Sequence, residues 1–247
     1  MTQKDYFSDR SALYAKFRPV YPAALFDALA QLPAHRRVAL DCGTGSGQAA
    51  VGLAAHFERV VATDPSEAQL EHAVAAPNVE YRCARAESSG LADGSIDLVT
   101  AAQALHWFDI AGFFEEARRV LAPGGVVAVW GYGDPVLEDE RLHAIVHEFN
   151  RGLLEPWWYP ERKLLLAGYR TIDFPFAEIT TPEFTLEQRW SLHQLAGLLR
   201  TWSATARYSA EHGIDPVHDV EAALGKQWGD PTTPRVVRWP VYLRAGR

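Results

Sequence analysis

Short apolar runs alternate with helical patterns through the first half of the chain. Strands are predicted over 37–41, 59–64, 78–84, 95–102 and 126–130, with helices between them. The runs are nearly continuous in valine, alanine and isoleucine, whereas a strand with one wet face alternates apolar and polar residues. We therefore expect an α/β fold in which helices cover both faces of a doubly wound parallel sheet.

The pattern changes on both sides of this alternation. Polar and aromatic residues fill 1–21, and Pro22 is predicted to begin a helix. After Gly133, helices are predicted over 138–150, 161–168, 186–208 as a linked pair, and 217–228. An edge strand over 176–185, interrupted by Pro182, and a last strand over 235–243 accompany them.

These patterns predict one domain over 1–247 with four parts. The parts are an N-terminal helical cover over 1–34, a cofactor-binding core over 35–133, an inserted helical lid over 134–175, and C-terminal strands and helices over 176–247.

Composition narrows the class of protein. The 247 residues carry a net charge of −7, which offers no basic surface to nucleic acid. Two cysteines form no disulfide framework, residues 1–10 are polar, and no apolar run reaches the roughly 18 residues that span a bilayer. We expect a cytoplasmic monomer or homodimer that binds neither nucleic acid nor a membrane.

A glycine turn follows the first strand. Residues 40–47 read Leu-Asp-Cys-Gly-Thr-Gly-Ser-Gly and lead into an alanine-rich helix. Glycines at alternate positions let backbone approach a ligand closely, and a helix N-terminus offers free N–H groups. Asp64 ends the next strand, where a carboxylate can accept both hydroxyls of a ribose. As an alternative, Asp64 caps the helix that begins at Pro65 and Ser66.

The spacing of the turn separates two classes of ligand. Dinucleotide-binding turns typically read G-x-G-x-x-G, but Gln48 stands where the last glycine would be. Asp41 beside the turn would also repel a pyrophosphate. An acid at this position suits a cationic ligand that carries an amino group, such as S-adenosylmethionine.

Several ordered segments resemble those of class I S-adenosylmethionine-dependent methyltransferases: 40–47, 62–64, 86–87, 95–99 and 121–125. Residues 14–22, 103–109 and 201–203 resemble the methyltransferase type 11, trans-aconitate methyltransferase-like branch. The resemblance implies a Rossmann-like sheet of seven strands with an antiparallel last strand. It also implies S-adenosyl-L-methionine as cofactor and methyl transfer as the reaction.

The resemblance further implies a set of cofactor-binding residues. The glycines would line the methionine end, Asp64 would hold the ribose, and Ala86 with Glu87 would flank the adenine. The full set is Tyr14, Arg18, Asp41, Gly43, Thr44, Gly45, Gly47, Asp64, Pro65, Ala86, Glu87 and Gln103. One departure is Arg85, because many class I members have an acid there that bonds the adenine amino group.

The chemistry of methyl transfer suggests the acceptor. A carboxylate is already ionised at neutral pH and needs only groups that aim it, whereas an amine or phenol must lose a proton. We expect a small-molecule acceptor, with a carboxylic acid as first choice. Candidate residues are Arg18, Tyr21, His106, Trp107, Trp157, Trp158, Arg170 and Trp202.

Most of these candidate residues also have a structural explanation that involves no ligand. Each aromatic side chain can be core packing, and Arg18 can cap the first helix. His106 is either a general base or a residue that orients the loop around Trp107.

The sequence also bears on a metal site and on two other functions. His143 and His147 have the spacing of a metal pair, but no third ligand is identifiable, so we expect no metal. An NAD(P)-dependent oxidoreductase and a non-catalytic ligand-binding module of the same fold remain alternatives to a methyltransferase.

Overall fold

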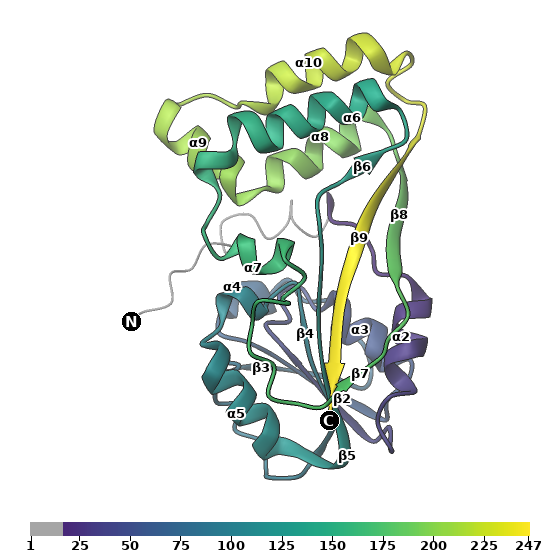
Figure 1. The fold of residues 1–247 in the computed structure, drawn as a ribbon, viewed down its shortest axis with the longest axis vertical. Coiled ribbons are helices and arrows are strands. Elements are labelled where there is room, and N and C mark those ends of the chain that lie inside the picture. Colours follow the sequence, from purple (N-terminus) through teal and green to yellow (C-terminus); the bar gives the residue numbers. More distant parts are fainter. Residues whose placement is uncertain (1–16) are drawn as a thin grey trace. The chain divides into compact units, whose positions relative to one another are not determined.

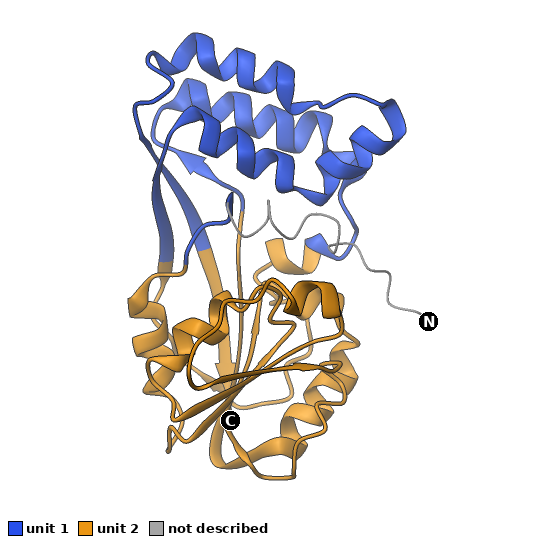
Figure 2. Ribbon diagram, turned by 180° about the vertical axis from the view of Figure 1, so that it is seen from behind, with its two compact units in different colours: residues 1–20, 134–162, 185–240 blue, residues 21–133, 163–184, 241–247 orange. Residues whose placement is uncertain are grey.

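The structure is a computed structural model that describes residues 17–247. Within it the chain forms two compact units, coloured separately in Figure 2. The core unit comprises residues 21–133, 163–184 and 241–247, and the helical unit comprises 134–162 and 185–240 with the described residues before 21. Both segments named above as lid and C-terminal part therefore contribute to each unit.

Strands and helices alternate in the core unit. Their bounds are α2 (Ala23–Ala30), β1 (Val38–Cys42), α3 (Gln48–Ala54), β2 (Arg59–Asp64), α4 (Glu67–Leu70), β3 (Val79–Cys83), β4 (Ile96–Ala102), η2 (Leu105–Trp107), α5 (Ile110–Val120) and β5 (Leu121–Tyr132). Later segments add α7 (Arg162–Leu166), β7 (Glu178–Ile179) and the second half of β9 (Arg235–Gly246).

The core sheet has the strand order β3-β2-β1-β4-β5-β9, and β7 pairs with β9. The first five strands pair in parallel, whereas β9 runs antiparallel to β5. The described residues of the core unit therefore form the predicted seven-stranded sheet with an antiparallel last strand. In the helical unit β6 (Val136–Leu137) pairs with the first half of β9. Strand β8 (Phe184–Trp190) also pairs with β9, which brings the described sheet to nine strands.

Helices cover both faces of the core sheet, as predicted. Side chains from alternate positions of β1, β4 and β5, such as Leu40, Val99 and Val127, pack with Phe113 and Ala117 of α5. The other positions of these strands are equally buried, and α3 contacts β1 and β2 there while α2 packs on α3. Figure 1 shows α5 on one side of the sheet and α2 with α3 on the other.

The remaining helices belong to the helical unit. They are α6 (Glu140–His147), η3 (Glu148–Leu153), η4 (Glu155–Trp157), α8 (Leu192–Thr201), α9 (Ser203–His212) and α10 (Val217–Trp228). Helix α10 packs on α6 and α8, and the predicted helix over 217–228 has the bounds that we expected. None of the helices between Phe17 and Arg247 is long and apolar enough to cross a membrane.

Two local predictions were wrong for physical reasons. Residues 186–190 were predicted as helix but complete β8, because Leu186 and Trp190 point inward at a strand period and Ser191 caps α8 only afterwards. The apolar pattern also predicts a helix over 66–75, between the second and third strands, but the structure shortens it to α4. The chain after α4 leaves the helix and returns to the glycine turn, where the Val74 N–H donates to the Ser46 carbonyl.

A buried acid ties α5 to the loop before β4. The carboxylate of Glu116 accepts from the N–H and hydroxyl of Ser89, at 2.8 and 2.5 Å, and from the guanidinium of Arg119 at 2.7 and 2.8 Å. The bond from Arg119, with those from Ser89, holds the pKa of Glu116 at about 2 against the opposing effect of burial.

We therefore expect Glu116→Gln to lower the free energy of unfolding by about 1–3 kcal/mol at pH 7. The folded-state pKa lies below the ordinary value of 4.5, so the contribution is complete above that pH and is lost as pH falls toward 2. Urea unfolding at pH 7 and pH 3 measures it. The control is Glu115→Gln, an exposed neighbour on α5, which should change stability by less than about 0.5 kcal/mol. Equal losses at both pH values would contradict the assignment.

Candidate functional site

A buried carboxylate stands at the end of β1. Asp41 is fully buried; one oxygen accepts from the Thr44 hydroxyl at 2.7 Å and the other from the Thr100 hydroxyl on β4 at 2.8 Å. Burial raises the pKa of Asp41 to about 6, and the two hydroxyls oppose that rise. Predicted to bind cofactor, Asp41 lies beneath the turn and joins its start to the neighbouring strand.

The three glycines of the turn have different surroundings. All have positive φ, at +65° for Gly43, +55° for Gly45 and +84° for Gly47. A Cβ on Gly43 would lie 2.7 Å from that of Ala104, and one on Gly47 would lie 2.1 Å from the hydroxyl of Tyr81. A Cβ on Gly45 would meet nothing closer than 3.9 Å. Two glycines thus serve packing, and only Gly45 faces open space.

Asp64 at the end of β2 holds the turn from the other side. One oxygen accepts from the Gly45 N–H at 2.9 Å and the other from the Ser66 N–H at 2.9 Å. The cap of α4 is the Ser66 side chain, which accepts from the Gln69 N–H, so the alternative that Asp64 caps this helix is wrong. A carboxylate oxygen can accept more than one hydrogen bond. Pro65 beside it is exposed.

The two residues predicted at the adenine have structural partners. Ala86 is buried in the cluster that packs on α5. The Glu87 carboxylate accepts from the Asp109 N–H at 2.8 Å, at the start of α5, and pairs with Arg85 at 3.1 Å. Glu87 therefore fixes the loop before α5, and Arg85, the departure from the family pattern, neutralises it.

Gln103 follows β4 in a strained backbone conformation. Its φ is +56°, which L-residues rarely adopt. Its side-chain oxygen accepts from the Tyr132 N–H at 2.9 Å, and its own N–H donates to the Trp130 carbonyl at 2.7 Å. A Cβ on Gly131 would lie 2.5 Å from that oxygen, so a larger residue there would displace the Gln103 amide. The end of β4 is thereby fixed to the end of β5.

His106 lies in η2, three residues after Gln103. The imidazole is buried, and its Nδ1 lies 3.0 Å from the hydroxyl of Tyr169, which follows α7. Burial lowers the pKa of His106 to about 3 and raises that of Tyr169, so both groups are neutral at physiological pH. Trp107 packs against His106 with ring centroids 4.8 Å apart.

Two further residues of the core unit were predicted to bind the acceptor, and they differ in burial. Tyr21 is buried edge-on against Trp130 at 5.7 Å and beside Tyr132, which is the core-packing alternative. Arg170 is exposed, although its neighbour Tyr169 is fully buried.

The other aromatic candidates lie in the helical unit. The Trp158 indole N–H donates to the side chain of Asn150 at 3.0 Å, and Arg162 lies 3.7 Å over its ring. Trp202 is buried, stacks on Phe149 and packs beside Trp158. Trp157 packs edge-on against two rings of α9.

The candidate residues before the core complete the predicted set. Arg18 belongs to the helical unit and is half-buried, whereas Tyr14 lies outside the described residues. The His143 and His147 rings are 6.0 Å apart, and residues 17–247 contain no group of three or more His, Cys, Asp or Glu side chains that could hold a metal ion.

Sequence reasoning missed three residues of this site. Thr100, Gly131 and Tyr169 carry no motif. Each is identified only by its contact with Asp41, Gln103 or His106. Strand register offered one usable signal, because Thr100 pairs with Asp41 across β1 and β4.

The chain matches known methyltransferases. The family model described as a methyltransferase domain matches residues 40–129. A Dictyostelium discoideum protein provisionally named as a methyltransferase is 34% identical over 246 residues, covering 97% of this chain and 93% of its own. A Saccharomyces cerevisiae protein provisionally named as an S-adenosylmethionine-dependent methyltransferase is 30% identical over 138 residues. The match covers 52% of this chain and 47% of that protein.

A solved structure agrees with the fold described above. The protein, from Anaeromyxobacter dehalogenans and provisionally named as a type II methyltransferase, is 46% identical, with a TM-score of 0.87 over 94% of this chain and 98% of that one. The trans-aconitate methyltransferase-like branch stays a prediction. The sequence matches and the shared fold place the chain in the class I S-adenosylmethionine-dependent methyltransferases, with S-adenosylmethionine as its cofactor.

Proposed function

We propose that this methyltransferase methylates a carboxylate oxygen of a small molecule. The observation that carries the proposal is the state of His106, the titratable side chain of η2. With a pKa of about 3 it is too weak a base to take a proton from an amine or a phenol at neutral pH. A carboxylate, with a pKa near 4, arrives without a proton to remove.

The cofactor side of the site fits a nucleoside. Among the three glycines of the turn, only Gly45 has open space in the direction in which a Cβ would project. Asp64 borders that space because its carboxylate accepts from the Gly45 N–H, and a carboxylate at the end of this strand can accept from ribose hydroxyls. Strand ends on either side of a change in strand order are where open α/β sheets bind ligands, and β1 and β4 meet at such a point.

When bound, S-adenosylmethionine supplies a methyl group activated by a sulfonium. The protein's own part is positioning, because an in-line displacement depends on alignment of the reacting atoms. Asp41 holds the turn, Gln103 holds the end of β4, and Glu87 holds the loop before α5. The adenine position of Ala86 and Glu87 rests on the family resemblance.

Four residues that the sequence predicts to hold the acceptor lie outside the core unit. Arg18, Trp157, Trp158 and Trp202 belong to the helical unit, and their role in holding the acceptor remains a prediction. Net charge of −7 disfavours a nucleic acid as the acceptor, which supports a small molecule.

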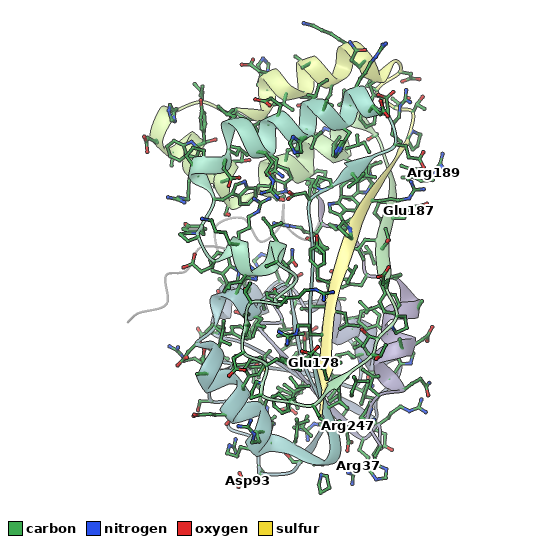
Figure 3. All side chains as sticks on the ribbon, viewed as in Figure 1. Arg37, Asp93, Glu178, Glu187, Arg189 and Arg247 are labelled. Atoms are coloured by element: carbon green, nitrogen blue, oxygen red, sulfur yellow. The ribbon has the colours of Figure 1, made fainter. Side chains whose placement is uncertain are left out.

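Asp64→Asn should weaken S-adenosylhomocysteine binding about 10- to 150-fold, because hydrogen bonds to a charged group contribute about 1.5–3 kcal/mol. Titration calorimetry measures it. The matched control is Asp97→Asn. The carboxylate of this buried acid, at the start of β4, accepts from the N–H groups of Arg37 and Val38. Figure 3 shows Arg37 at the lower end of the core unit. The control should lower thermal stability and leave affinity within about twofold. Equal affinity losses in both variants would assign Asp64 to stability alone.

Gly45→Ala should reduce S-adenosylhomocysteine affinity more than about tenfold, because its Cβ fills the open space of the turn. The positive φ adds a strain of about 1–2 kcal/mol to the folded state. Gly94→Ala is the control, since it has a φ of +63° and nothing within 4 Å of its Cβ. It should show the same loss of stability with unchanged affinity. Matching affinities in the two variants would remove Gly45 from the cofactor site.

The acceptor class can be tested with methyl-labelled S-adenosylmethionine. The acceptors are short aliphatic mono-, di- and tricarboxylic acids, simple phenols, and primary and tertiary amines. We expect label in the acids, released as volatile methanol by mild alkali, because a methyl ester hydrolyses under conditions that spare aryl ethers and methylamines. Alkali-stable label in phenols or amines would contradict the carboxylate. Label in no compound, despite tight S-adenosylhomocysteine binding, would favour a non-catalytic module.

A further inference from the structure

The hydroxyl of Tyr169 has one partner. Tyr169 is fully buried, and its only hydrogen bond to the described residues joins its oxygen to Nδ1 of His106 at 3.0 Å. Burial raises the pKa of this phenol, so it keeps its proton at physiological pH. A buried hydroxyl proton without an acceptor costs about 1–3 kcal/mol. The Tyr169 hydroxyl therefore donates to Nδ1.

That donation fixes the proton of the imidazole. In a neutral histidine one ring nitrogen accepts and the other carries the proton. We propose that Tyr169 holds His106 as the Nε2–H tautomer, and that this N–H donates a hydrogen bond to an oxygen of the methyl acceptor. The second part rests on the proposed carboxylate methylation. His106 then aims the acceptor as a donor, and Tyr169 is the positioning residue behind it.

The backbone keeps Tyr169 in place. It adopts a φ of +57°, and with Gln103 it is one of two non-glycine residues with positive φ in residues 17–247. Its carbonyl accepts from the Arg244 guanidinium at 2.6 Å, and Arg244 also pairs with Glu178. A Cβ on Gly131 would lie 3.3 Å from the Tyr169 hydroxyl, so glycine there leaves the hydroxyl its room. Strain that persists through such contacts is typical of functional sites.

The donor lies beside the cofactor turn. Gly43 touches Ala104, which stands two residues before His106, so the turn after β1 packs on the segment that carries the imidazole. Nε2 of His106 has no hydrogen-bond partner among the described residues. The proposal therefore assigns this nitrogen to a ligand bound at the carboxyl ends of β1 and β4, where open α/β sheets bind ligands.

This arrangement selects the acceptor by chemistry. A carboxylate has two oxygens, so one can attack the methyl group while the other accepts the Nε2–H bond. An amine has a single lone pair, which the attack uses, and the buried N–H would be left unpaired. A fixed donor thus favours an oxyanion over an amine without any proton transfer.

Nitrogen-15 NMR of the histidine-labelled protein with S-adenosylhomocysteine tests the tautomer without any acceptor. The His106 signals are assigned by their loss in His106→Gln. We expect the Nε2–H pattern, and Tyr169→Phe should convert it to a mixture. Ser89→Ala, which removes another buried hydroxyl of the core unit, should leave it unchanged. An Nδ1–H tautomer or an imidazolium in the unmodified protein would overturn the inference.

Turnover of an acid that the labelling panel identifies tests the donor role. A glutamine amide can supply an N–H near the position of Nε2 but cannot act as a base. We expect His106→Gln to keep kcat within about tenfold of the unmodified enzyme, and His106→Ala to lose about 10- to 150-fold. Circular dichroism and S-adenosylhomocysteine affinity check that both variants fold. Equal losses would overturn the donor role. Failure to methylate any acid would instead overturn the proposed function, while the tautomer measurement would stand.

Discussion

The carboxylate of Asp41 is fully buried, so its hydrogen-bond donors must come from within the protein. They are hydroxyls of Thr44 in the glycine turn and of Thr100 on the adjacent strand. Because β1 and β4 lie where the strand order changes direction, these bonds join the glycine turn to β4 at the edge of the sheet where such folds bind ligands. Removing either hydroxyl would leave a buried charge undercompensated. The shape of the turn therefore depends on this carboxylate before any ligand binds.

Strain is concentrated on the other side of the same site. Gln103 and Tyr169 both have positive φ, and hydrogen bonds to β5 and from Arg244 hold them there. Gly131 lies beside both side chains, with no room for a Cβ. Each conformation costs free energy that the surrounding contacts offset. These contacts keep the Tyr169 hydroxyl beside the imidazole of His106. A fixed imidazole suits a reaction that depends on the alignment of the reacting atoms.

The sequence was informative where structure is local. Continuous apolar runs predicted the parallel strands, and the turn at Gly43 to Gly47 was predicted because its positive φ values require glycine. Tyr169 could not be found in this way. It lies 63 residues from His106, and its role arises from a backbone bend and the loss of water around a hydroxyl. The pattern pointed instead to its neighbour Arg170, which is exposed.

The two sides of the site differ in charge, and this difference bears on the reaction. On the proposed cofactor side, the carboxylate of Asp41 is buried beneath the turn and that of Asp64 holds the Gly45 N–H, so both place negative charge near a ligand that carries positive charge. On the proposed acceptor side, His106 and Tyr169 stay neutral because burial disfavours their ions. A cationic imidazole there would repel the sulfonium in a site of low dielectric, where such repulsion is strong. A neutral N–H avoids that repulsion and can still bind an oxyanion, which accounts for a histidine kept uncharged at this position.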